Sequence, residues 1–251
     1  MLAVQYIDYG NTMANTGSMV VAAPKASRRY HSPHREARSR ATRQRVLSAA
    51  TTLFAECGYA GTTVRAVAAM AKVSIPTVET LFGTKARLLK ASIDVAIAGD
   101  DEPMPMLDRD WAMAANEATD VETLLSIFAG VLGPAQARSS GLVLSVFEGA
   151  GADPDLAVLA DQMSAQRTTM ATWVVGRLTG LEALDTDISE DEAVDTLFAL
   201  MEPALFDRLI RQRGWTQDRY QHWVERSLRC LLASDATRRY ESTTTTERTS
   251  T

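Results

Sequence analysis

The side chains that most often catalyse reactions or bind metals are few and scattered in this sequence. The three histidines are His31, His34 and His222, and none belongs to a recognisable nucleophile–histidine–acid or metal-ligand motif. Cys57 and Cys230 are too few for a disulfide framework or a zinc site, and we expect both to be buried free thiols. The sequence therefore predicts no enzyme, no cofactor and no metal site.

One acidic cluster leaves a choice open. Asp100, Asp101 and Glu102 follow each other in a predicted linker. Neighbouring carboxylates can hold a hard cation, but a run of charges is more often simply solvated. We expect solvated charges here.

Small polar residues at regular places point instead to hydrogen bonding with DNA. Thr63 precedes a helical pattern over residues 64–71, and a three-residue turn, 72–74, follows it. Ser74 then precedes a second short helix that ends at Phe82. This is the pattern of a helix-turn-helix, whose second helix enters a major groove about 12 Å wide with its first turn toward the base edges.

The side chains around this turn are the candidate DNA contacts. Hydroxyl groups can bind bases or phosphates, and apolar groups such as Ile75 can touch thymine methyls. Thr63 and Lys85 each open a helix, where free N–H groups meet a phosphate. The expected DNA-binding residues are Thr63, Arg65, Ser74, Ile75, Pro76, Thr77, Glu79 and Lys85.

The elements that must position these residues all read as helices. Apolar residues at spacings of three and four predict a first helix over residues 41–57, with Gly58 as its cap, and Thr84 caps a helix from Lys85 to Ala98. The run Gly141–Phe147 is compatible with a strand by composition, but its surroundings favour a helix. Further helices are expected at Asp108–Ala118, Val121–Ala137, Gly141–Gly149, Pro154–Thr179, Glu190–Arg213 and Gln217–Ala233.

These segments predict an all-α fold: an N-terminal three-helix helix-turn-helix domain and a C-terminal helical bundle, to which a resemblance to a known family assigns effector binding and dimerisation. The expected divisions are a disordered arm with a basic end, a helix-turn-helix domain, a ligand-binding and dimerisation domain, and a disordered tail. Their bounds are 1–35, 36–90, 91–234 and 235–251.

Charge is distributed unevenly along the chain. Residues 1–100 hold 13 Lys and Arg against 6 Asp and Glu, a net charge of +7, whereas residues 101–251 hold 13 against 25, a net charge of −12. A basic first part suggests a polyanionic partner for that part alone. No stretch is long and apolar enough for a membrane span, so we expect no membrane partner and a cytoplasmic location.

The motif also resembles a known family. The run RQRVLSAATTLFAECGYAGTTVRAVAAMAKVSIPTVETLFGTKARLL is similar to the N-terminal domain of TetR/AcrR-family regulators. The likeness includes the Gly-Tyr turn, the paired threonines, the Val-Ser turn and the closing Phe-Gly-Thr-Lys. It covers about a fifth of the chain. It implies that DNA contacts come from Thr63, Ser74, Pro76, Thr77 and Lys85.

The sequence departs from the family pattern at three positions. Glu79 stands where a phosphate-binding tyrosine is usual, and Leu81 where histidine or tyrosine is common. A carboxylate repels phosphate unless it turns to a cytosine amino group or to an arginine. Lys72 replaces a common glycine, which adds a phosphate contact or imposes an unfavourable positive φ.

The resemblance extends, less specifically, to the second half. It implies a homodimer through the last two long helices and a small apolar or aromatic ligand that weakens DNA binding. Candidate interface residues are Leu197, Leu200, Leu205, Leu209, Leu228 and Leu231. Candidate ligand-binding residues are Trp111, Phe128, Phe147, Met170 and Trp173.

Three hypotheses follow. The first is a DNA-binding transcriptional regulator, a repressor released from its double-stranded operator by a small ligand. The second is a ligand-binding or scaffold protein that keeps the fold but has weakened or lost DNA binding, which Glu79 motivates. The third is a helical enzyme, for which no residue set offers a mechanism.

Overall fold

A computed structural model describes residues 33–234 of the chain. The predicted tail, most of the predicted arm and its basic residues Lys25, Arg28 and Arg29 lie outside this range. Within it the secondary structure is helical apart from one isolated bridge between Leu184 and Ala233, so the all-α class is confirmed. No helix of the described part is long and apolar enough to cross a membrane.

The first helix begins earlier than predicted. α1 spans Pro33–Gly61, so residues 33–35 are helical and do not belong to an arm. Gly58 has a φ of 67°, as expected for a residue that ends a helical run. The turns of α1 before Thr42 belong to a separate unit. The compact unit that contains the other helices starts at Thr42.

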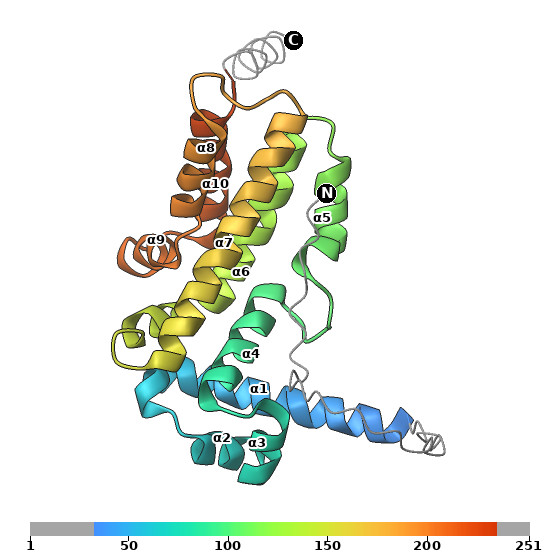
Figure 1. The fold of residues 1–251 in the computed structure, drawn as a ribbon, viewed down its shortest axis with the longest axis vertical. Coiled ribbons are helices and arrows are strands. Elements are labelled where there is room, and N and C mark those ends of the chain that lie inside the picture. The colour runs from blue at the N-terminus through green and yellow to red at the C-terminus, as the bar shows by residue number, and fades with distance from the viewer. Residues whose placement is uncertain (1–32, 235–251) are drawn as a thin grey trace, which may run out of the picture. The chain divides into compact units, whose positions relative to one another are not determined.

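The next three helices have the predicted bounds, since each begins at a side-chain cap. α2 spans Val64–Ala71, α3 spans Ile75–Phe82 and α4 spans Lys85–Ala98. The hydroxyls of Thr63, Ser74 and Thr84 accept from the backbone N–H three residues on, at 3.1–3.2 Å. Figure 1 shows α2 and α3 crossing each other beneath α4.

The effector part is built on two long helices that run side by side (Figure 1). After α5 (Asp110–Glu117), α6 spans Val121–Gly149 and α7 spans Pro154–Gly180. The predicted break in α6 near residues 138–140 is wrong. Ser139 and Ser140 are buried there, and the Ser139 hydroxyl donates to the carbonyl of Ala135 at 2.8 Å, so packing on both sides of the helix overrides their turn preference.

The predicted helix Glu190–Arg213 is also wrong. α8 spans Glu190–Leu200, and a short helix, α9, starts anew at Pro203–Asp207, followed by one π-helical turn over Arg208–Gln212. Because a proline disfavours the helical region for the residue before it, Glu202 is extended, with ψ 122°. α10 then spans Gln217–Leu232.

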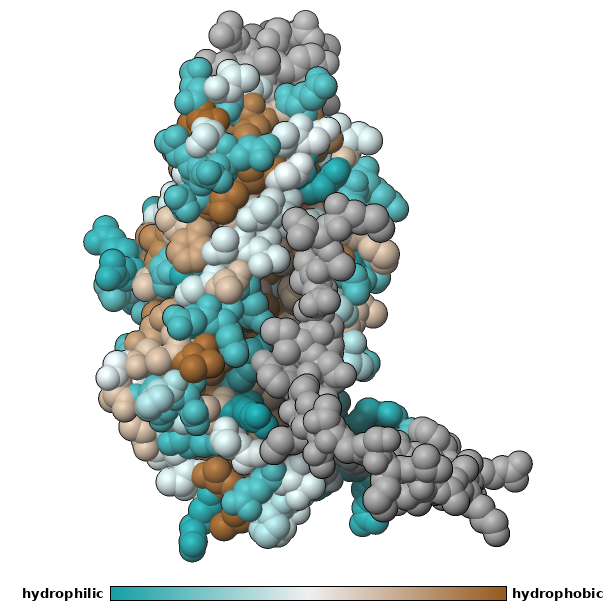
Figure 2. Space-filling view, in the orientation of Figure 1, coloured by the Kyte–Doolittle hydropathy of each residue, from teal (hydrophilic) through white to brown (hydrophobic). Residues whose placement is uncertain are grey.

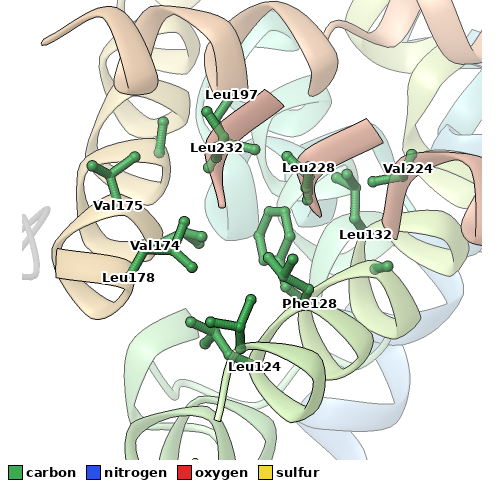
Figure 3. Close-up of a cluster of buried hydrophobic side chains, with 14 of the residues drawn as sticks. Leu124, Phe128, Leu132, Val174, Val175, Leu178, Leu197, Val224, Leu228 and Leu232 are labelled. Carbon is green, nitrogen blue, oxygen red and sulfur yellow. The ribbon is translucent and has the colours of Figure 1, made fainter. Parts of the chain in front are cut away.

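Two buried clusters form the core. One joins α1–α4 to the facing ends of α6 and α7, and the other joins α5, α6, α7, α8 and α10. Figure 3 shows the second cluster, in which Leu197 and Leu228 point among the side chains of α6 and α7. Both are fully buried, so neither serves as an interface residue.

Candidate nucleic-acid interface

The turn between α2 and α3 gives the second helix an exposed outer face. Lys72 closes α2 in the left-handed conformation, with φ 55° and ψ 48°. The positive φ that the sequence left open for this residue is therefore present. On α3, Val78 and Phe82 are buried while Pro76, Glu79 and Thr80 are exposed. In Figure 2 hydrophilic residues surround a small apolar patch at this end of the unit.

The predicted base readers are not equally available. Ser74 is exposed, but its hydroxyl caps α3 and also lies 2.8 Å from the hydroxyl of Thr77. Thr77 is only half-exposed, and Ile75 packs partly against the core. Thr80, which the sequence reasoning missed, lies on the same outward face as Pro76 and Glu79. The sequence could have indicated this, because Thr80 lies four residues after Pro76 and so on the same face of the helix.

The carboxylate of Glu79 has no hydrogen bond or ion pair among the described residues, and the side chain is exposed. The alternative in which it turns to a nearby arginine therefore has no counterpart within residues 33–234. Its carboxylate stays on the outer face of α3.

Lys85 has a second set of partners. Its Nζ donates to the carbonyl oxygens of Tyr59 at 3.0 Å and Thr62 at 3.2 Å, and lies 3.9 Å from the centre of the Tyr59 ring. Tyr59 follows the break in α1 at Gly58 and Thr62 follows the end of the helix, so the ammonium holds together the junction between α1 and α2. An ammonium has three N–H donors, which leaves one for a phosphate.

The same junction holds Thr63 in place. Thr62 is buried, and its hydroxyl lies 2.8 Å from the carbonyl oxygen of Gly58 and 3.0 Å from that of Leu53. Thr63 is exposed and caps α2. Burial of the Tyr59 phenol, together with the nearby carboxylate of Asp153, raises the pKa of Tyr59 to about 12.

Exposed cations surround this junction and the start of α4. Arg65 is exposed on the first turn of α2, as expected for a phosphate contact. Arg87, exposed on the first turn of α4 and close to Gly83, was missed by the sequence reasoning. Its signal was its place three residues after the cap Thr84, where a cation joins free backbone N–H groups.

The acidic linker joins this domain to the effector helices through ion pairs. Arg43 on α1 donates from Nε to both carboxylate oxygens of Asp101, at 2.9 and 3.1 Å, while its guanidinium lies over the Phe82 ring. Asp100 accepts two hydrogen bonds from Arg109, at 2.7 and 2.9 Å. The expectation of solvated charges agrees with the exposure of Asp100 and Glu102, but not with Asp101, which is partly buried against Arg43.

The thiols and the metal ligands can be assessed over residues 33–234. Both cysteines are free but exposed, so the expectation of burial is wrong: Cys230, for example, lies on the face of α10 opposite Leu228 and Leu232. No group of three or more His, Cys, Asp or Glu side chains in this part of the chain is arranged to hold a metal ion.

The predicted ligand-binding residues do not line one cavity. Trp111 and Trp173 meet edge to face, with ring centres 5.7 Å apart, and Met170 packs beside them against the effector core. Phe128 is buried inside that core, whereas Phe147 belongs to the other cluster. Of the five, only Trp111 lines the cleft of about 470 Å³ between α4, α5 and α6.

Comparisons with known proteins agree with this geometry. Residues 46–92 match the family model described as bacterial regulatory proteins, tetR family. A TetR-family transcriptional regulator from Rhodococcus sp. superposes with a TM-score of 0.58 at 14% identity, over 77% of this chain and 99% of that one. Residues 46–92 thus match the tetR-family DNA-binding domain, and the chain has the TetR-like fold.

Other solved TetR-like structures share the fold. A transcriptional regulator from Saccharomonospora viridis in complex with choline has a TM-score of 0.57 at 16% identity, over 76% of this chain and 97% of that one. SmeT in complex with triclosan has a TM-score of 0.60 at 15% identity, over 78% and 94%. At such identities the likeness shows the fold. A search of curated protein sequences finds no match.

Proposed function

We propose that the chain is a homodimeric, non-enzymatic repressor that binds an operator in double-stranded DNA and is released from it by a small apolar ligand. The observation that carries the proposal is the outward face of α3, presented by a capped helix-turn-helix within the tetR-family match. Because the proposed operator lies on the chromosome, we expect the protein to act in the cytoplasm. Base reading is assigned to Pro76, Thr77, Glu79 and Thr80, and anchoring to Thr63, Arg65, Lys85 and Arg87.

Dimerisation supports the reading of two half-sites about 34 Å apart. The faces available for it are on α8, α9, the π-helical turn after it and α10. Leu231 is 50% exposed, and Leu200, Leu205 and Leu209 are half-buried. The first turn of α8 is acidic while α10 carries exposed Arg219 and Arg226, so unlike charges can pair across a two-fold interface.

The test is binding of the full chain to the DNA upstream of its own gene, measured by fluorescence anisotropy. Affinity should fall steeply between about 50 and 200 mM salt, because each phosphate contact releases counterions. Arg87→Ala should weaken binding to all sequences alike, whereas Thr80→Ala should change the preferred sequence. No binding at low salt would refute the proposal.

Glu79 supports a second candidate, in which the fold is kept and DNA binding is lost. Glu79→Gln removes the charge at almost constant size, so relief of phosphate repulsion should strengthen binding about fivefold, the equivalent of about 1 kcal/mol. If Glu79 instead reads a cytosine, the variant binds its preferred sequence more weakly. Binding of neither protein at low salt favours the second candidate.

A further inference from the structure

The linker that follows α4 is bonded to the first helix of the DNA-binding domain. Asp101 accepts two hydrogen bonds from the Nε atom of Arg43 on α1, at 2.9 and 3.1 Å. Only 16% of the Asp101 side chain and 35% of the Arg43 side chain are exposed. Because water reaches this ion pair only in part, salt screens it less than a pair on the open surface.

The guanidinium of Arg43 also contacts the helix that faces outward. Its central carbon lies 4.8 Å from the centre of the ring of Phe82, which is the last residue of α3. A cation above an aromatic face is attracted by the electrons of the ring. The linker and the end of α3 therefore meet through one arginine side chain, although they belong to different parts of the sequence.

Phe82 helps to decide which face of α3 points outward. Val78 and Phe82, one turn apart, are buried on the inner face. Pro76, Glu79 and Thr80 are exposed on the outer face. α3 has only eight residues, too few for a stable isolated helix, so its contacts with neighbouring elements fix its orientation. Because base contacts require hydrogen-bond geometry, a small rotation of α3 is enough to lose them.

We infer that Asp101 is a positioning residue for sequence recognition: through Arg43 and Phe82 it holds α3 in the orientation that reads bases. The inference rests on the proposed function and adds to it a residue of the linker, outside the helix-turn-helix. Binding to DNA of any sequence depends instead on phosphate contacts, which are assigned to other cations such as Arg65 and Arg87. Asp101 should therefore affect the preference among sequences and not the affinity for DNA in general.

The linker offers a matched control at the next residue. Glu102 is exposed and forms no salt bridge among the described residues. Asp101→Asn and Glu102→Gln each remove one negative charge at almost constant size. By charge alone, both changes should strengthen binding to DNA slightly, because a carboxylate repels phosphates. A loss of affinity in Asp101→Asn would therefore have a sign opposite to the effect of net charge.

The test measures binding of the full chain to two duplexes by fluorescence anisotropy. One is a sequence that the wild-type chain selects from random DNA, and the other is a scrambled duplex of the same composition. Asp101→Asn should lower the preference for the selected duplex about tenfold, which is comparable to the loss of one good base contact. Its affinity for the scrambled duplex should stay the same or rise slightly, and Glu102→Gln should keep the full preference.

A second variant tests whether the effect passes through the arginine. Arg43→Gln should lower the preference by a similar factor, and the double variant Arg43→Gln/Asp101→Asn should lose no more than either single variant, because both residues act through one contact. The ratio of two affinities does not depend on the fraction of folded chain, so a loss of stability alone leaves the preference unchanged.

The inference is overturned by an unchanged preference in Asp101→Asn, by an equal fall in Glu102→Gln, or by additive losses in the double variant. A wild-type chain that selects no sequence refutes the proposed function and this inference with it. A wild-type chain that selects a sequence, together with an Asp101→Asn variant that keeps the full preference, refutes this inference alone.

Discussion

The DNA-binding helices and the effector helices end for different reasons. α2, α3 and α4 each begin at a Ser or Thr cap and end at a residue with positive φ, namely Lys72, Gly83 and Gly99. The effector helices α6 and α7 have 29 and 27 residues, and α6 runs through Pro134 and two buried serines. Local signals therefore set both ends of α2, α3 and α4. α6 and α7 also begin at side-chain caps, Asp120 and Asp153, but burial on several sides lets α6 continue past residues that favour a break.

Pro134 shows how burial overrides a local signal. It has no N–H to donate and its ring crowds the carbonyl four residues earlier, which belongs to Gly130. Gly130 has no side chain, and the side chain of Gln221 on α10 packs over it. The contacts of α6 with α7 and α10 hold the helix across a residue that would end an isolated one.

The largest expected effect is on the free energy of unfolding, and it distinguishes a core leucine from a surface leucine on α10. Leu228→Ala should lower the free energy of unfolding by about 3 kcal/mol, because it leaves a cavity in the effector core. The matched change Leu231→Ala should cost under about 0.5 kcal/mol of protomer stability and should instead weaken self-association. Urea unfolding and sedimentation at several concentrations measure both, and equal costs would contradict this division of the two faces.

Next in size is the effect of Lys85 at the junction between α1 and α2. Lys85→Ala should lower the free energy of unfolding by about 1–2 kcal/mol, since a half-buried ammonium loses bonds to two carbonyls. Among the described residues, Lys90 on the same helix pairs only with Asp94 one turn on, so Lys90→Ala should cost under about 0.5 kcal/mol. Similar values for the two would mean that the bonds of Lys85 add no stability.

A smaller effect concerns the two non-glycine residues with positive φ within residues 33–234, one in each domain. Lys72 and Glu182 have φ of 55° and 53°. Glycine at either position relieves strain but adds entropy to the unfolded chain, so Lys72→Gly and Glu182→Gly should each stabilise by up to about 1 kcal/mol. Thermal unfolding checks this, and marked destabilisation by either would show that its side chain contributes contacts worth more than the strain.

The smallest effect is a titration. The hydrogen bonds from Arg109 lower the pKa of Asp100 from 3.8 to about 2. A lowered pKa contributes stability that is complete above pH 3.8 and is lost as the pH falls toward about 2. In Arg109→Gln the carboxyl pKa, followed by NMR, should return toward 3.8; a value that stays near 2 would assign the shift to another cause.

Much of the DNA-binding domain was predictable from its residues. The bounds of α2, α3 and α4, their three caps and the turn at Lys72 all follow from signals within a few positions of each helix end. The predicted DNA contacts were harder, because exposure depends on what packs behind α3. Thr77 is half-exposed and Thr80 faces outward, although both are threonines on one short helix.

The sequence by itself determined the helical class, the helix-turn-helix and its likeness to TetR-family regulators, because caps, turns and hydrophobic spacing act over one or two turns of chain. Only the tertiary structure decided that α6 is continuous, that Leu197 and Leu228 are core, and that Asp101 bonds to Arg43. It also decided that Trp111 and Arg109 line one cleft. Each of these depends on which distant segments pack together, and no local pattern of residues specifies that.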